Sequence, residues 1–426
     1  MKLLVVGGGG REHAIIKKLK ENPAVENIVA LPGNAGIAAD AECVPIKATD
    51  IDGIVDYVRN HPVDFAVVAP DDPLALGCVD RLHALGVKCF GPNAAAARIE
   101  ASKVFAKDLM KKYHIPTAAY EVFGDAGKAL EYVKKCPLPT VVKADGLALG
   151  KGVTICFTRD EAEAAVRACM LEGAFGTSGS RIVVEEYLEG PEVSVLAFTD
   201  GHVVKPMVSS MDHKRVGDGD TGPNTGGMGT VAPNPCYTPE VARRCMEEIF
   251  LPTVAAMNAE GCPFKGCLYF GLMVTADGPK VIEYNCRFGD PETQVVLPLM
   301  KSDLLTVMLA VENETLADTP VEFSDGAASC VMLASGGYPG KYEKGKVIDL
   351  GNAPELAEIF HSGTGRNERG ELVTAGGRVL GVCCTSNDLQ TAVEKAYRAV
   401  GEVRWDGMIH RTDIGSRALS ILNEGK

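Results

Sequence analysis

Four consecutive glycines follow the first apolar run of the chain, and this junction constrains the fold more than any other feature. Leu3 to Val6 form the run, Gly7 to Gly10 the turn, and apolar residues over 15–19 then recur at helical spacing. This pattern predicts a strand that turns into a helix. Similar segments follow, with strand patterns at 28–31, 65–69 and 88–90 and a helix pattern over 74–85. The alternation predicts a parallel sheet with helices on both faces.

The pattern changes beyond this first unit. Asn93 follows Gly91-Pro92 and is a suitable N-cap for a helix that we expect to run to about residue 113, leaving the first unit near residue 100. A small α+β subdomain is predicted by patterns at 140–143, 145–152, 153–157, 160–171, 182–186 and 193–198. Residues 209–235 have dense turn chemistry and predict a long loop. Later strands are expected at 266–274, 280–284, 329–334 and 378–384.

Length, charge and cysteine usage limit the classes of function. A chain of 426 residues has room for two to four domains. Its 43 Lys and Arg against 56 Asp and Glu give a net charge of −13, which would repel a nucleic-acid backbone. The 14 cysteines form no CxxC pair and are expected to be mostly buried apolar residues. With no signal-peptide core and no apolar stretch of membrane-span length, we expect a cytoplasmic protein with no nucleic-acid or membrane partner.

The opening glycine turn has three possible interpretations. Free N–H groups at a helix N-terminus suit a phosphate, but such a turn can also be ligand-free or belong to a dinucleotide site. A dinucleotide site requires an acidic residue at the end of the second strand, where this chain has the sequence Leu31-Pro32-Gly33-Asn34-Ala35-Gly36. The residues therefore favour a simple phosphate over NAD.

Two motifs in the middle of the chain suit a nucleotide. Lys143 leaves an apolar strand beside the glycine-rich segment 145–152, an arrangement that can bind a polyphosphate. A solvated hairpin is the alternative, and it suits Lys151 better than Lys143. Residues 183–192 end a strand in several carboxylates, which offers backbone groups to adenine and acidic groups to ribose hydroxyls, although an exposed acidic turn has the same pattern.

A third motif suits a metal ion and a transferring phosphoryl group. Glu283 and Asn285 are two residues apart on a predicted strand, so their oxygens share one face, which Arg287 continues. Hard cations such as Mg²⁺ prefer such oxygens, and a guanidinium stabilises phosphoryl charge. In isolation an edge-strand ion pair would be the more common explanation.

Together these motifs resemble the ATP-grasp superfamily, and the whole chain resembles its phosphoribosylamine–glycine ligase family. The matching runs lie at 5–13, 32–36, 102–107, 212–229, 287–294, 376–381 and 405–408. The resemblance implies a multidomain α/β and α+β fold. A Rossmann-like, pre-ATP-grasp domain with a parallel sheet would span 1–101, an ATP-grasp domain 102–325 with a small lid subdomain at about 122–190, and a C-terminal α/β domain 326–426.

The resemblance also implies a reaction. ATP, glycine and 5-phosphoribosylamine would give glycinamide ribonucleotide, ADP and phosphate through a glycyl phosphate, in de novo purine biosynthesis. A carboxylate must first be phosphorylated because its charge repels an amine and oxide is a poor leaving group. The implied cofactor is Mg²⁺ or Mn²⁺, and we expect a monomer.

Roles for individual residues follow from the same resemblance. The implied catalytic residues are Arg287, Lys214 and Asp212, and the implied metal ligands are Glu283 and Asn285. The implied ATP-binding residues are Lys103, Lys143, Gly150, Lys151, Gly152, Glu185, Glu186, Leu188 and Glu192. The implied substrate-binding residues are Gly8, Gly9, Gly10, Asn34, Gly36, Gly226, Gly227, Met228, Asp290, Glu292 and Thr293. His13 and His213 receive no catalytic role.

Two departures from the family pattern affect these roles. Asp71 stands where relatives usually have glutamate, and the strand over 269–275 lacks the second metal carboxylate common in ATP-grasp enzymes. Three other functions remain alternatives: an ATP-grasp carboxylase acting on bicarbonate, a nicotinamide-dependent oxidoreductase and a non-catalytic nucleotide-binding regulator. The 212–229 segment counts against the carboxylase, and the missing acid after Leu31 counts against the oxidoreductase. A non-catalytic regulator would not need the phosphate and metal motifs together.

Overall fold

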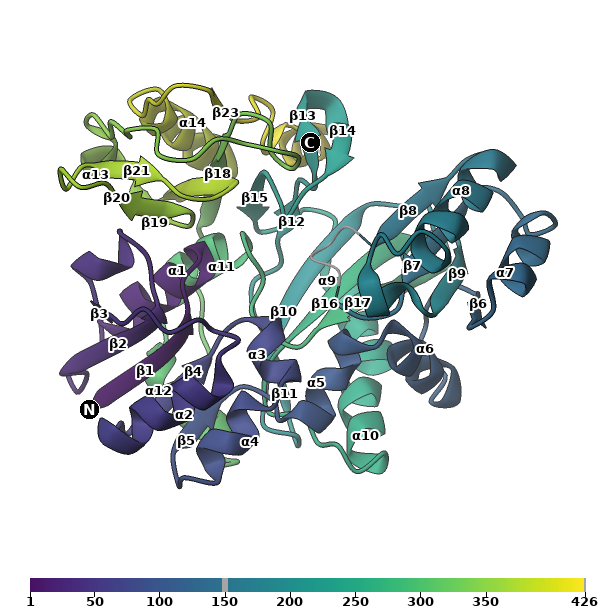
Figure 1. The fold of residues 1–426 in the computed structure, drawn as a ribbon, viewed down its shortest axis with the longest axis horizontal. Helices are drawn as coiled ribbons and strands as arrows, with labels where there is room; N and C mark the ends of the chain where they lie inside the picture. The colour runs from purple at the N-terminus through teal and green to yellow at the C-terminus, as the bar shows by residue number, and fades with distance from the viewer. Residues whose placement is uncertain (148–151, 425–426) are drawn as a thin grey trace.

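The N-terminal part of the chain is a parallel α/β layer, as predicted (Figure 1). The protein is described by a computed structural model that covers residues 1–147 and 152–424. The strand order is β3-β2-β1-β4-β5 and every pairing is parallel. The strands are β1 (Lys2–Gly7), β2 (Asn27–Pro32), β3 (Glu42–Cys43), β4 (Phe65–Val68) and β5 (Lys88–Phe90).

Both faces of this sheet are buried by helices. Leu3 and Val5 of β1 pack with α1 (Gly10–Leu19) and α12 (Leu304–Glu312), whereas Leu4 and Val6 pack with α2 (Ile51–Asn60) and α4 (Cys78–His83). This alternation is the two-residue period of a strand covered on both sides.

Two helices predicted as continuous are each divided in two. The helix expected over 74–85 is α3 (Asp71–Ala75) and α4, separated by Gly77 in the left-handed region at φ +79°. The helix expected from Asn93 to about 113 is α5 (Ala94–Ala101) and α6 (Lys103–Lys112). The Asn93 cap is confirmed, but extended Ser102 ends α5 and caps α6 by accepting a hydrogen bond from the Phe105 amide at 3.1 Å.

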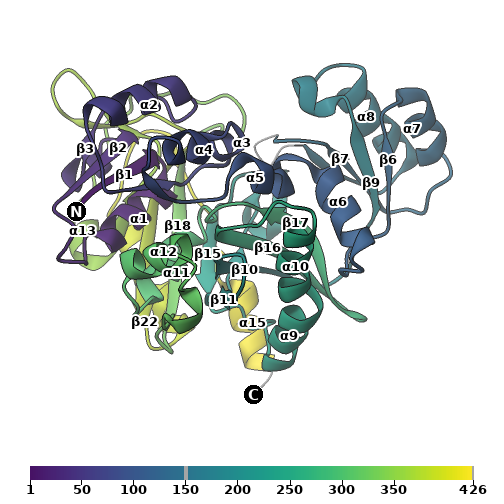
Figure 2. The same cartoon turned by 90° about the horizontal axis from the view of Figure 1, so that it is seen from below.

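A small antiparallel sheet follows, and it stands apart from the N-terminal layer (Figures 1 and 2). Its strand order is β6-β9-β7-β8, and α7 (Ala126–Val133) and α8 (Arg159–Met170) pack on it. The strands are β6 (Tyr120–Phe123), β7 (Thr140–Ala144), β8 (Val153–Cys156) and β9 (Ile182–Glu186). The predicted strand at 193–198 is β10 (Glu192–Thr199), and it belongs to the neighbouring sheet instead.

That neighbouring sheet is antiparallel, with the order β11-β10-β16-β17. Its other strands are β11 (Val204–Pro206), β16 (Gly266–Thr275) and β17 (Gly278–Asn285). Phe270 and Tyr284 pack in one core with Leu109 of α6 and Met257 of α10 (Leu251–Ala259). Before α10 the chain forms α9 (Pro239–Arg244) and a π-helical turn over Cys245–Phe250. On the opposite face, Leu196, Phe198 and Tyr269 pack in a second core.

The segment at 209–235 was predicted to be a loop, and this was wrong in part. It contains β12 (Met211–Asp212), β13 (Arg215–Gly217), β14 (Thr221–Asn224) and β15 (Gly229–Ala232). β13 and β14 form a two-stranded ribbon, while β12 and β15 join the C-terminal sheet in the order β12-β15-β18-β22-β19. Strands of two to four residues between glycines are too short to show a two-residue period, which explains the error.

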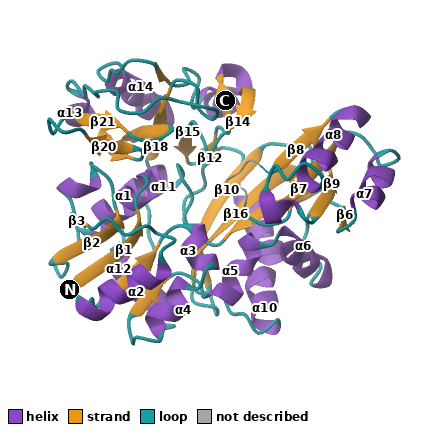
Figure 3. Cartoon of the chain, viewed as in Figure 1, coloured by secondary structure: helices purple, strands orange, loops and turns teal. Residues whose placement is uncertain are grey.

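The C-terminal sheet is completed by β18 (Ala327–Ser335), β19 (Glu358–His361), β22 (Arg378–Ser386) and β23 (Met408–Ile409). Helix α14 (Leu389–Val400) packs on one face and α11 (Thr293–Leu299) on the other (Figure 3). The remaining elements are α13 (Ala353–Leu356), α15 (Ser416–Glu424), the β20–β21 ribbon (Thr364–Arg366, Leu372–Thr374) and short 3₁₀ turns at 37–39, 176–179, 218–220 and 316–318. None of the helices in the described ranges could cross a membrane. All cysteines are free, and all except Cys43 and Cys236 are buried.

The N-terminal and C-terminal sheets meet through two histidines. His13 of α1 donates from Nε2 to Asp40 at 3.1 Å, and its Nδ1 accepts a hydrogen bond from the His361 amide at 2.8 Å. Asn34 donates to the carbonyls of Gly8 and His361. Desolvation by burial is the main cause that lowers the pKa of His13, so the neutral ring is the form that this contact holds.

We expect His361→Asn to reduce the loss of stability in mild acid. Burial, followed by the effect of His13 and Lys17, lowers the pKa of His361 to about 3. The unfolded chain binds this proton near pH 6.5, so the contribution of His361 is complete above pH 6.5 and declines towards pH 3, by at most ~1.4 kcal/mol per pH unit. Urea unfolding at pH 7.5 and 5.5 should show a smaller difference for the variant than for wild type. Exposed His61→Asn is the control, and equal differences in all three proteins would contradict the expectation.

Candidate active site

A buried carboxylate holds two lysines between the two antiparallel sheets. Glu185 of β9 accepts ion pairs on Oε2 from Lys143 of β7 at 3.0 Å and from Lys107 of α6 at 3.1 Å. All three side chains are at most 5 % exposed. Lys143 also donates to the Ile282 carbonyl of β17 at 3.1 Å, and Lys107 to Thr117 at 2.8 Å. Glu185 Oε1 is buried and has no partner among the described residues, so it leaves an acceptor for a bound group.

Lys107 was not predicted as a site residue. Burial lowers its pKa to about 8, against the opposing effect of Glu185. The sequence held a signal for it, because Lys107 lies four residues after Lys103 and so shares its helix face. Lys103 donates from Nζ to the Gly146 carbonyl at 2.8 Å, and its own pKa is lowered mainly by burial.

The start of the glycine-rich segment is fastened to α6. Asp145 accepts hydrogen bonds from the Ser102 hydroxyl and the Val104 amide at 3.1 Å, and it pairs with Arg181 at 2.6 Å. Gly152, just before β8, accepts a hydrogen bond from the Ala144 amide at 2.8 Å. The predicted ATP-binding residues Gly150 and Lys151 lie outside the described residues.

Glu283, Asn285 and Arg287 share one face, as their spacing predicted. Arg287 donates to Asn285 Oδ1 at 2.9 Å and pairs with buried Glu100 of α5 at 3.0 Å. Glu100 in turn accepts a hydrogen bond from the Cys286 amide at 2.7 Å. Glu100 was missed because nothing in the local sequence links it to a strand almost 190 residues away. Asp71 is close enough for its charge, after that of Glu100, to raise the pKa of Arg287 against the effect of burial.

Glu283 lies at the meeting point of the cations. Burial acts to raise its pKa, but Lys214, Lys143, Lys103 and Arg287 together hold it below the usual value. None of the described residues donates a hydrogen bond to this carboxylate, so its oxygens are available to a ligand. An unpaired carboxylate beside an amide oxygen fits a hard divalent cation. Within the described ranges no group of three His, Cys, Asp or Glu residues could hold a metal ion, so these two residues would supply only part of a coordination shell.

A second pair of carboxylates faces the same region. Glu292 is 4 % exposed and accepts a hydrogen bond from Tyr269 at 3.1 Å, and Tyr269 shares another with Ser194 at 2.8 Å. Burial and then the charge of Glu292 raise the pKa of Asp212 well above its usual value, and burial is also the main cause that raises the pKa of Glu292. Gly227 lies against Asp212 and against Pro291, the residue before Glu292, since a Cβ atom there would be 2.7 Å from Asp212 Oδ1 and 2.4 Å from Pro291 Cδ. The glycine is therefore required for this close approach.

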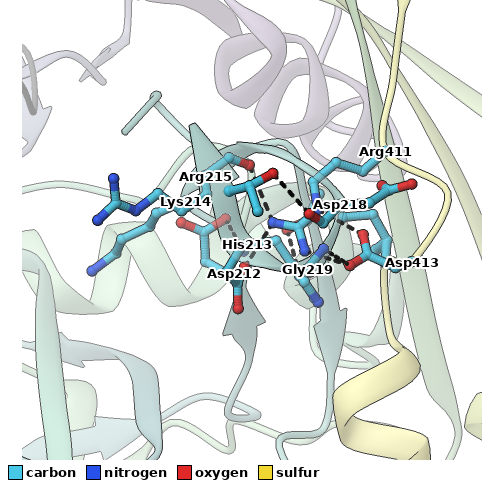
Figure 4. Close-up of polar contacts among 12 residues, drawn as sticks. Asp212, His213, Lys214, Arg215, Asp218, Gly219, Arg411 and Asp413 are labelled. Carbon is cyan, nitrogen blue, oxygen red and sulfur yellow. Dashed lines mark hydrogen bonds and ion pairs between the residues drawn. The ribbon is translucent and has the colours of Figure 1, made fainter. Parts of the chain in front are cut away.

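Lys214 follows Asp212 and pairs with Glu192 at 2.7 Å, which joins a predicted catalytic residue to the predicted ribose ligand. Figure 4 shows the Lys214 side chain pointing away from a second cluster, in which Arg411 binds the β13–β14 ribbon. Arg411 is 2 % exposed, pairs with Asp413 at 2.7 Å and Asp220 at 2.8 Å, and donates to the Arg215 carbonyl at 3.1 Å. The ribbon is thus attached to the C-terminal part of the chain.

The backbone amides of the glycine turn were expected to be free to bind a phosphate, but the Gly9 amide already has a partner in the chain. The Gly9 amide donates to Glu12 Oε2 at 2.6 Å, and Glu12 Oε1 pairs with Arg11 at 2.6 Å. A carboxylate of the chain therefore occupies the start of α1. The signal was present in the sequence, because Glu12 stands at the third helical position. The predicted substrate residues Asn34 and Gly36 bond to one another, with the Gly36 amide donating to Asn34 Oδ1 at 2.8 Å.

Other predicted residues are distributed around these centres. Glu186 is exposed on β9 and accepts a hydrogen bond from the Ala119 amide at 3.1 Å, and Leu188 lies just beyond that strand. Asp290 accepts a hydrogen bond from Gln294 at 2.8 Å, Thr293 is buried at the start of α11, and the Met228 amide donates to the His213 carbonyl at 2.8 Å. The structure therefore brings Lys103, Lys143, Lys214, Asn285 and Arg287 together around Glu283, whereas the Asn34 turn belongs to the contact between the N- and C-terminal sheets.

Comparison with known proteins defines the class first. A biotin carboxylase from Campylobacter jejuni, solved with an ATP analogue, has the same fold at a TM-score of 0.73 and 14 % identity, covering 96 % of this chain and 92 % of that one. Residues 101–293 match the sequence model described as "Phosphoribosylglycinamide synthetase, ATP-grasp (A) domain". The fold and the matched sequence are those of an ATP-grasp enzyme.

Further matches define the family within this class. Residues 1–100 and 328–417 match the N and C domains of the same synthetase. Phosphoribosylamine–glycine ligases from Vibrio vulnificus (strain YJ016) and Escherichia coli O6:H1 are 48 % and 47 % identical, over 99 % and 98 % of this chain and 99 % of each relative. The crystal structure of that ligase from Thermotoga maritima matches with a TM-score of 0.85 and 35 % identity, covering 97 % of this chain and all of that one. The chain belongs to the phosphoribosylamine–glycine ligase family.

We expect Lys143→Ala to weaken ATP binding about tenfold, because one charge-assisted contact to a phosphate is lost. Calorimetric titration with a non-hydrolysable ATP analogue and Mg²⁺ measures the dissociation constant. Lys111→Ala, on the exposed side of α6, is the matched control and should leave it unchanged. An unaltered dissociation constant for Lys143→Ala would remove this lysine from the nucleotide site.

Proposed function

We propose that this protein ligates glycine to 5-phosphoribosylamine, using ATP and releasing ADP and phosphate, with glycinamide ribonucleotide as the product. This reaction belongs to purine biosynthesis. The observation that carries the proposal is the convergence of Lys103, Lys143, Lys214 and Arg287 on Glu283, next to the carboxylate pair of Asp212 and Glu292. The cluster of cations suits phosphates and the glycine carboxylate, and the pair of carboxylates suits an ammonium group.

The order of steps follows from the chemistry of a carboxylate. A glycine carboxylate oxygen attacks the γ-phosphorus of ATP, which forms glycyl phosphate and releases ADP. The sugar amine then attacks the acyl carbon, the C–O bond to phosphate breaks, and the amine loses one proton. Arg287 would stabilise the charge on the transferring phosphoryl group, while Lys103 and Lys143 would contact the nucleotide phosphates.

Further roles rest on position. Glu283 and Asn285 would hold the metal ion, Mg²⁺ or Mn²⁺, which when bound neutralises phosphate charge. Adenine would contact Glu185, Glu186 and Leu188. Glu185 Oε1 has no partner among the described residues and could accept a hydrogen bond from adenine.

The acidic pair would receive the glycine ammonium. Half-buried Asp212 and buried Glu292 both have raised pKa values, so a cation between them would be stabilised. Lys214, two residues from Asp212 and paired with Glu192, would lie beside the glycine carboxylate. The ammonium of glycine would then lie beside carboxylates, and its carboxylate would lie beside a lysine.

We also propose the division of the chain into domains at 1–101, 102–325 and 326–426, with the lid at about 122–190. The lid would exclude water from glycyl phosphate, which hydrolyses readily. A monomer in the cytoplasm is the expected form, in keeping with free cysteines throughout.

The decisive assay is ADP release by the purified chain with Mg²⁺. We expect ADP to form only when glycine and 5-phosphoribosylamine, generated in the assay, are both present, since the acyl phosphate is consumed by the amine. Bicarbonate in place of glycine tests the carboxylase alternative. ADP release that depends on bicarbonate, or that ignores glycine, would overturn the proposal.

We expect Glu283→Ala to lower kcat by roughly two orders of magnitude or more at saturating Mg²⁺, because the phosphoryl charge loses its counter-ion. Glu394→Ala, on the exposed face of α14, is the control and should keep wild-type turnover. Near-wild-type kinetics for Glu283→Ala would refute the metal role.

A further inference from the structure

Arg378 starts β22, directly after two glycines, and has no role in the proposed reaction. Its Nη1 donates to the Gly226 carbonyl at 2.6 Å and to the Asp290 carbonyl at 2.8 Å, and its Nη2 pairs with Asp290 Oδ2 at 3.3 Å. The side chain is 17 % exposed. One guanidinium therefore joins two loops, around Gly226 and Asp290, that are far apart in the sequence.

These loops carry the acidic pair. Gly226 precedes Gly227, whose backbone packs against Asp212 Oδ1 and Pro291. Asp290 begins the turn that presents Glu292. The separation of the two carboxylates thus depends on how the Gly226 and Asp290 carbonyls are spaced, and Arg378 bonds to both.

The residues around Arg378 fit this task. Gly377 allows Tyr338 to approach, since a Cβ atom there would be 2.3 Å from the Tyr338 ring, and the Tyr338 hydroxyl accepts a hydrogen bond from the Gly226 amide at 3.0 Å. The carbonyl and amide of Gly226 are therefore both bound by the C-terminal part of the chain. A planar guanidinium can serve two carbonyls and a carboxylate at fixed angles, which a lysine ammonium cannot do.

Arg411 does not duplicate this contact. Its partners are Asp413, Asp220 and Arg215, on the ribbon and the C-terminal segment. It holds the β13–β14 ribbon of the 212–229 segment, whereas Arg378 holds Gly226, beside the glycine that contacts Asp212.

We propose that Arg378 is a positioning residue, which sets the spacing of the Gly226 and Asp290 loops so that Asp212 and Glu292 face the glycine ammonium together. The inference rests on the proposed function. It assigns the C-terminal sheet a direct part in binding the amino acid, although Arg378 itself does not contact the reacting atoms.

The test compares Arg378→Met, Arg378→Lys and Arg378→Ala with exposed Arg366→Met from the β20–β21 ribbon. For Arg378→Met we expect kcat/KM for glycine to fall at least tenfold, with the dissociation constant for a non-hydrolysable ATP analogue within twofold of wild type. Arg378→Lys should recover little, because charge alone does not bridge the loops. Guanidinium at millimolar concentration should restore part of the activity of Arg378→Ala and leave wild type and Arg366→Met unaffected.

Hydrogen exchange shows whether the loops are the cause. Peptides covering 225–228 and 289–293 should exchange faster in Arg378→Met, while peptides from β7 and β9 keep wild-type rates. Wild-type kinetics in Arg378→Met would overturn the inference, and so would a parallel loss of glycine and ATP binding with exchange raised throughout the chain. If wild type itself shows no glycine-dependent ADP release, the proposed function has failed, not the role of Arg378 alone.

Discussion

The structure depends on how cations are brought together inside an acidic chain. With a net charge of −13, the protein cannot rely on its overall field to attract a polyphosphate. The partly exposed Lys214 instead pairs with Glu192, and buried cations are held by buried carboxylates: Lys143 and Lys107 share Glu185, and Arg287 pairs with Glu100. Burying an unpaired charge costs several kcal/mol, so these pairs allow the cations to remain buried before any ligand binds. Glu283 differs from these carboxylates, because four cations lower its pKa but none of the described residues donates a hydrogen bond to it.

This arrangement requires contributions from separate sheets. The small sheet supplies Lys143 and Glu185, the central sheet supplies Glu283 and Asn285, and the C-terminal sheet continues through β12 and β15 into the Asp212 segment. No single sheet holds a complete set of groups. The contacts that cross between sheets, such as Lys143 to the Ile282 carbonyl, therefore set the geometry of the site.

Much of the fold followed from the sequence where a period was long enough to measure. The alternation in the first hundred residues predicted the parallel sheet, and the spacing of Glu283, Asn285 and Arg287 predicted their common face. Short breaks were missed, because Ser102 and Gly77 each interrupt a helix through one residue's backbone. Partners distant in sequence were also missed. No local pattern marks Glu100, and Arg378 lies in the matching run 376–381, but its partners Asp290 and Gly226 are 88 and 152 residues away.

The same limit explains the glycine turn. Free amides after a glycine run favoured a phosphate, but Glu12 reaches back to the Gly9 amide and places a carboxylate there. An anion that approached this turn would have to displace Glu12 or bind beside it, and Arg11, which pairs with Glu12, also donates to the Phe288 carbonyl. The turn is therefore linked to the segment that runs from Arg287 to Glu292. Any substrate contact at the start of α1 would act on Arg11 and Glu12, and through them on the loop that carries the acidic pair.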